Sequence, residues 1–183
     1  MFRQHFNLHS TAVDGAILVA IGVTLMGWLS PQVWNLQGSL PITPQSLIMV
    51  LWGVLWGWQV GTAAVLTYLL VGGIGLPVFA GTPEKGIGIS YMIGPTGGYL
   101  VGFIASVFIA GFVNLNKNIF VKFSLISLAI FAIYITGVPW LAYLAGWEVA
   151  YIWGIKNFVL AEVLKISILV LSTEKLLKIR KFI

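Results

Sequence analysis

Two stretches decide the fold of this chain: Gly75-Leu76-Pro77-Val78-Phe79-Ala80-Gly81 and Gly94-Pro95-Thr96-Gly97-Gly98-Tyr99-Leu100-Val101-Gly102-Phe103. The first predicts a turn after an apolar run, because glycine permits positive φ and proline ends a regular helix. The second predicts the start of a helix, where the missing N–H of Pro95 is not needed. Small residues then recur every four positions, which leaves one face of this helix bare enough for another helix or a flat ligand. They are Gly94, Gly98, Gly102, Ser106 and Ala110.

Composition places the chain in a membrane. Of its 183 residues, 59% are hydrophobic and only 8% are charged, and the mean hydropathy is +0.99. A water-soluble domain of this size carries much more charge. The sequence therefore predicts an all-α integral membrane protein, with one membrane-embedded domain over residues 1–183. The N-terminus lacks the pattern of a removable signal peptide, so we expect it to lead into the first span.

Six membrane-spanning helices are expected. The stretch from residue 15 to residue 83 has no formal charge and is far too long for one crossing of about 20 residues. Glycines at 53, 57 and 61 are compatible with one long helix over 45–74, or with a division near Gly57. The six expected spans are about 11–28, 45–57, 60–74, 94–113, 119–137 and 152–173.

The basic residues favour the division. With six spans both termini share one side, and seven of the ten Lys and Arg residues lie on that side, against Lys85 and Lys156 near the other. By the positive-inside rule, both termini are then cytoplasmic. The loops at 30–43, 75–93 and 138–151 lie outside, so a site formed by them captures its ligand from outside. The seven cytoplasmic residues are Arg3, Lys117, Lys122, Lys175, Lys178, Arg180 and Lys181.

Several classes of function are disfavoured. The chain has no cysteine, and both histidines lie in the N-terminal tail, which makes a metal site a poor expectation. A Walker A loop and the common hydrolase motifs are absent from the sequence, so we expect neither an enzyme nor a chain that hydrolyses ATP itself. The net charge of +5 gathers after the last span, where it suits anionic lipid headgroups better than nucleic acid.

Two ionisable residues lie inside the last expected span. Glu162 and Lys165 are three positions apart and so share one face of a helix. Ionisable groups in a span are costly and are functional candidates for that reason. One interpretation is a mutually neutralised pair that fixes packing. The other is a site for a ligand that offers both N–H donors and a carbonyl acceptor.

The two glycine-rich stretches closely resemble the signature of the BioY family, the biotin-specific S components of energy-coupling factor (ECF) transporters. The segment from Gly154 to Lys165 also resembles a family segment, with Glu162 in place of the usual aspartate. Pro41-Ile42-Thr43-Pro44-Gln45 is similar to the family's entry to the second helix. The resemblance implies a multi-pass protein of a prokaryotic cell membrane that binds biotin. It also implies a coupling subunit and two ATPase subunits as partners, with no cofactor.

The resemblance implies a set of ligand-binding residues. Glu162 and Lys165 would bind the ureido ring, and Gln45 would either give an amide hydrogen bond or cap a helix. Phe79, Tyr91 and Trp140 are candidate aromatic walls, of which Phe79 is favoured because it lies in the first glycine-rich stretch. The longer Glu162 side chain keeps a related small ligand open as an alternative, and a small facilitator that acts alone is a second alternative. The predicted binding residues are Glu162, Lys165, Phe79, Gly81, Gln45, Tyr91 and Phe158.

The first span carries an alanine stripe at Ala12, Ala16 and Ala20. Small residues at this spacing let another helix pack against the backbone. Periodicity alone leaves open whether that helix belongs to this chain or to a partner. S components share an Ala-x-x-x-Ala motif in their first helix, so the resemblance implies that the stripe docks on the coupling subunit.

Overall fold

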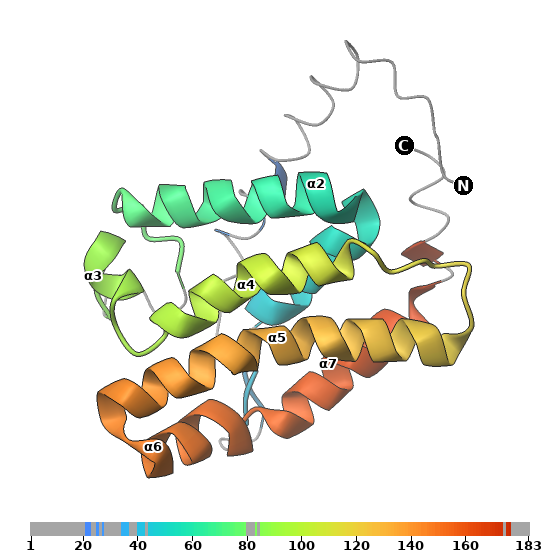
Figure 1. Ribbon diagram of the computed structural model, residues 1–183. Coiled ribbons are helices and arrows are strands. Elements are labelled where there is room, and N and C mark those ends of the chain that lie inside the picture. The colour runs from blue at the N-terminus through green and yellow to red at the C-terminus, as the bar shows by residue number, and fades with distance from the viewer. Residues whose placement is uncertain are drawn as a thin grey trace.

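The computed structural model describes residues 21, 22, 25, 27, 34–36, 40–42, 44–79, 83, 85–173, 175 and 176. These residues form a helical bundle with a short two-stranded hairpin (Figure 1). By length and composition, Ile119–Ala145 (α5) is able to cross a membrane, as is Gln45–Gly73 (α2) if it is taken as one unbroken helix, and Gly97–Ala110 (α4) is a shorter apolar helix. The other elements are β1 (Trp34–Leu36), β2 (Leu40–Ile42), α3 (Gly88–Met92), α6 (Trp147–Tyr151), the π-helix η1 (Ile152–Lys156) and α7 (Val159–Leu171).

The α2 segment folds back on itself at Gly57, as the bend in Figure 1 shows. Gly57 has φ 79° and ψ 175°, a backbone conformation that lies outside the helical range. A Cβ on Gly61 would lie 3.1 Å from the Cα of Gly53, whereas a straight helix would separate these positions by about 12 Å. The predicted division of 45–74 is therefore confirmed, with glycines at the contact between the two arms.

The small-residue face of α4 packs against α5. A Cβ on Gly102 would lie 2.7 Å from the Cα of Ile133, and a Cβ on Gly98 would lie 2.6 Å from the carbonyl oxygen of Thr136. Both positions are buried. Of the two interpretations of this glycine stripe, the structure supports close helix packing at these positions. The helix itself begins at Gly97, and Pro95 lies in the turn before it.

Two predicted loops contain regular structure. The prediction of a loop at 138–151 is wrong, because α5 continues through Pro139 to Ala145 and α6 follows after Gly146. A proline removes one backbone hydrogen bond, which neighbouring packing compensates in a membrane helix. Helix α5 ends instead at Gly146, whose φ is 88°. The segment expected as loop 75–93 contains the short helix α3.

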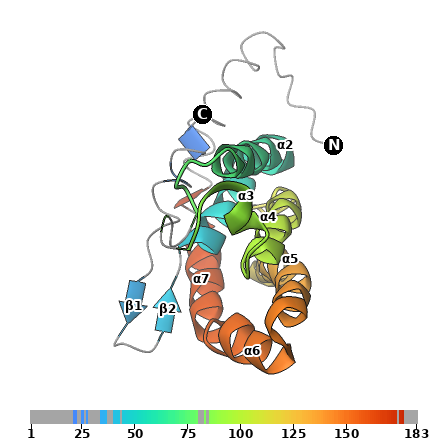
Figure 2. The same cartoon turned by 90° about the vertical axis from the view of Figure 1, so that its left-hand side faces the viewer.

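The connector at 30–43, predicted to be irregular, contains the antiparallel pair β1 and β2. Trp34 pairs with Ile42 and Leu36 with Leu40, so the all-α prediction needs this hairpin added. Every strand of a two-stranded hairpin is an edge, which tolerates a proline such as Pro41. The hairpin lies beside α7 (Figure 2).

Candidate functional site

The Glu162 and Lys165 side chains form a buried ion pair on α7. Lys165 Nζ lies 3.0 Å from Glu162 Oε1, and the two residues are 3% and 8% exposed. The predicted neighbours on one helix face are therefore brought together. The pair alone is compatible with both interpretations that the sequence leaves open.

Two further helices complete this site. Ser46, in the first turn of α2, donates to Glu162 Oε1 at 3.1 Å and accepts from Lys165 Nζ at 2.9 Å. Tyr134 on α5 donates its hydroxyl hydrogen to Glu162 Oε1 at 3.1 Å. Sequence reasoning missed Ser46 and Tyr134, because a serine after a helix start and a tyrosine in a span are both common. We call Ser46, Tyr134, Glu162 and Lys165 the polar cluster.

The polar cluster retains capacity for a ligand. Glu162 Oε1 accepts from three side chains, whereas Oε2 is contacted by Ser46 alone among the described residues, at 3.3 Å. A carboxylate has about four acceptor sites and an ammonium has three donors. Lys165 uses two of its donors on Ser46 and Glu162. Among the described residues, one N–H of Lys165 and acceptor capacity on Glu162 Oε2 therefore remain for an external partner.

A break in the last span positions the cluster. The π-helix η1 ends at Lys156, and α7 begins at Val159 after the turn at Asn157 and Phe158. Tyr99 on α4 donates its hydroxyl hydrogen to the carbonyl of Gly154 in η1, at 3.3 Å. Single turns of π-helix occur often at functional sites. The break places Glu162 in the first turn of α7.

Phe79, the predicted aromatic wall, is fully buried. Its ring stacks on Tyr91 with a centroid distance of 4.9 Å and meets Tyr68 edge to face at 5.4 Å. A Cβ on Gly72 would overlap the Phe79 ring. In this structure Phe79 anchors the first glycine-rich stretch to the end of α2.

Gln45 is buried and joins the same region. Its Nε2 donates to the Tyr68 hydroxyl at 2.9 Å, and Tyr68 donates to the carbonyl of Val78 at 3.0 Å. Helix α2 has no side-chain cap, and its N-cap residue is Pro44. The hydrogen bond of the Gln45 side chain to Tyr68 favours the amide-contact interpretation over that of a helix cap. Its amide connects the start of α2, through Tyr68, to the first glycine-rich stretch.

The other predicted residues lie around this region. Tyr91 is buried, and this burial raises the pKa of its phenol, an effect that a hydrogen bond with the Thr96 side chain partly offsets. Phe158 is half-buried beside the break before α7. Trp140 donates from Nε1 to the carbonyl of Gly94 at 2.9 Å, which holds the second glycine-rich stretch against α5. Gly81, Ala12, Ala16 and Ala20 lie outside the described residues.

Metal ligation has no support in the part of the chain that the structure describes. No group of three or more His, Cys, Asp or Glu side chains gathers there. The chemistry of the polar cluster is instead that of hydrogen bonding, with one cation and one anion at fixed positions.

Comparison with known proteins shows to which family this chain belongs. The BioY family model matches residues 3–182. The probable biotin transporter BioY of Pyrococcus horikoshii is 33% identical over 87% of this chain and 93% of its own length. The biotin transporter BioY2 of Lactococcus lactis subsp. cremoris is 28% identical over 86% of this chain and 87% of its own length. A crystal structure of the S-component for biotin from an ECF-type ABC transporter superposes with a TM-score of 0.72 at 22% identity, over 97% of this chain and 95% of that chain. The predicted S-component fold is thereby supported, and the chain belongs to the BioY family.

Proposed function

We propose that this chain binds biotin in the membrane and serves as the S component of an ECF-type vitamin importer. The observation that carries the proposal is the buried polar cluster in a BioY family member. The named relatives are biotin transporters, and the matching fold is that of an S component for biotin. The role is one of binding and transport, not of catalysis.

The ureido ring of biotin matches the capacity that the cluster retains. Its N–H groups donate, and its carbonyl oxygen accepts. An N–H of the ring would bind Glu162 Oε2, and the ring carbonyl would accept from the remaining N–H of Lys165. Hydrogen bonds to charged groups are worth about 1.5–3 kcal/mol each, so these two contacts account for much of the recognition of the head group.

The remaining predicted contacts surround this position. Gln45 and Tyr91 line the region between the start of α2 and α3, and Phe158 lies at the break before α7. Phe79 contributes by fixing the first glycine-rich stretch, which also contains Gly81. We propose that these residues form the walls and the entry of the site.

The proposal includes the arrangement in the membrane. Six spans would form one membrane-embedded domain with both termini in the cytoplasm of a prokaryote, and biotin would enter from the outer side. Energy would come from a separate module with a coupling subunit and two ATPase subunits. The alanine stripe at Ala12, Ala16 and Ala20 would dock on the coupling subunit.

Binding of labelled biotin to the purified chain in detergent tests the function. We expect saturable binding that unlabelled biotin displaces and that a vitamin without a ureido ring does not. Absence of saturable binding to folded protein would overturn the proposal. Uptake in ATP-free vesicles by the chain alone would instead favour a facilitator, whereas co-purification with ATPase subunits favours the S-component role.

A further inference from the structure

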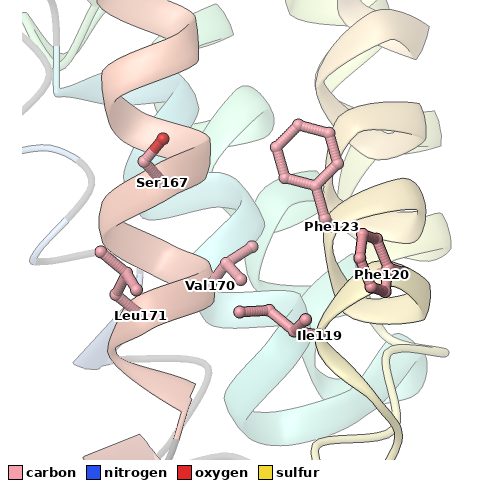
Figure 3. A pocket seen from close by; sticks show the side chains of 6 residues that line it. All are labelled: Ile119, Phe120, Phe123, Ser167, Val170 and Leu171. Carbon is pink, nitrogen blue, oxygen red and sulfur yellow. The ribbon is translucent and has the colours of Figure 1, made fainter.

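An apolar groove of about 550 Å³ lies between α5 and α7. It is formed by the start of α5 and the end of α7, away from the end of the bundle that carries α3 and α6 (Figure 1). The Ser167 hydroxyl donates a hydrogen bond to the carbonyl oxygen of Val163 within α7, at 2.8 Å. Figure 3 shows the side chains of the two helices on either side of the groove, which is lined by Ile119, Phe120, Phe123, Ser167, Val170 and Leu171.

The rim of the groove is exposed and almost entirely hydrocarbon. Phe120 is 78% exposed and Leu171 is 75% exposed, whereas Val170 on the floor is buried. Helix α5 is long and apolar enough to cross a membrane, and in the proposed membrane arrangement this surface would face lipid. The polar cluster is made from other parts of α5 and α7, and the groove shares no residue with it.

A cation lies at one end of the groove. Lys122 Nζ on α5 donates to Thr173 Oγ1, just after α7, at 2.9 Å and so bridges the two helices. Lysine side chains on a helix point toward its N-terminus. The N-terminus of α5 lies at the end of the bundle opposite α3 and α6 (Figure 1). In the described ranges, the only salt bridge is that of Lys165 with Glu162. The Lys122 ammonium therefore has donors left for an anion, and Lys117 and Lys175 are exposed near the same end.

We propose that this groove is a binding site for one anionic phospholipid. The acyl chain lies between α5 and α7, and the phosphate contacts Lys122. An apolar groove that ends at a cation matches a molecule with a hydrocarbon chain and an anionic head. A zwitterionic lipid gains less, because its own cationic group lies close to the same lysines.

Native mass spectrometry of the purified full-length chain tests this proposal. The chain is titrated with phosphatidylglycerol or phosphatidylcholine of identical acyl chains. We expect one phosphatidylglycerol to be retained in preference to phosphatidylcholine. Lys122→Gln should weaken its retention about fivefold, the effect expected for one lysine near an anionic headgroup. Ser167→Phe, which fills the groove, should weaken retention of both lipids.

Two matched variants control for general effects. Lys156→Gln removes an exposed lysine on η1, and Val101→Phe adds an aromatic ring at an exposed site on α4. Both should retain phosphatidylglycerol like the parent. Equal retention of the two lipids by the parent would overturn the proposal. So would unchanged retention in Lys122→Gln or in Ser167→Phe, or an equal loss in either control.

Discussion

Ser46 donates a hydrogen bond to Glu162 across 116 residues of sequence, with 3.1 Å between the two oxygens. The contact joins the first turn of α2 to the first turn of α7. It also places the Ser46 hydroxyl between the carboxylate of Glu162 and the ammonium of Lys165. The proposed biotin site therefore depends on how two distant helix starts pack together.

The ion pair is the first target for mutation. Glu162→Gln or Lys165→Met leaves one buried charge without its partner, which costs about 3–5 kcal/mol. We expect both single variants to melt at lower temperature in detergent and to bind labelled biotin at least tenfold more weakly. The double variant should regain most of the thermal stability without regaining binding. Parental affinity in both single variants would show that the pair is structural only.

Tyr134 should hold the Glu162 carboxylate in position. Tyr134→Phe keeps the ring, which is half-buried, but removes the donor to Oε1. A hydrogen bond to a charged group is worth about 1.5–3 kcal/mol, so we expect biotin affinity to fall about tenfold or more, as measured by equilibrium binding. Tyr143→Phe is the matched control, because Tyr143 on the same helix is 84% exposed. An equal affinity in Tyr134→Phe and the parent would remove Tyr134 from the site.

Gly72 is required by the ring of Phe79. Gly72→Ala places a methyl group against that ring, and overpacking of this kind costs about 1–3 kcal/mol. We expect a lower melting temperature, which Phe79→Leu in the same chain partly restores. Gly73→Ala is the control, because among the described residues its Cβ would meet only the Met92 sulfur, at 3.3 Å. A Gly72→Ala chain that melts like Gly73→Ala would contradict the packing described for Phe79.

The connector at 30–43 and the segment at 75–93 are predicted to close over the ligand. A bound head group near the membrane surface needs water excluded and apolar walls supplied. A cysteine introduced at Gly38, in this naturally cysteine-free chain, should react more slowly with a maleimide when biotin is present. A cysteine at exposed Lys117, near the other end of the bundle, provides the control. Equal labelling at residue 38 with and without biotin would argue against a lid.

The alanine stripe is predicted to be a partner surface. Ala16→Trp should leave biotin binding to the isolated chain intact but abolish assembly with the ATPase module and ATP-driven uptake, because a large side chain keeps the partner helix away from the backbone. Assembly is measured by co-purification. If the variant loses folding or binding while the complex persists, the stripe serves internal packing.

The sequence alone indicated the class of the protein, its family and the Glu162–Lys165 pair at the centre of the proposed site. The class follows from low charge and high hydropathy. These are totals over the amino-acid composition, so they can be calculated without knowing which residues are in contact. The division near Gly57 was also predicted, from the distribution of the basic residues along the chain, although the glycines alone were compatible with one long helix. The spacing of Glu162 and Lys165 on one helix fixed their contact, since neighbours on a helix face are set by local geometry.

The tertiary structure decided which residues join that pair. Ser46 and Tyr134 reach Glu162 because α2, α5 and α7 pack together, and contacts between distant helices depend on the summed packing of many side chains. The same packing carries α5 past Pro139, where local rules predict a loop, and buries Phe79 in a notch that Gly72 leaves open. Local chemistry thus specified the helices, breaks and charges, whereas their meeting points followed from three-dimensional packing.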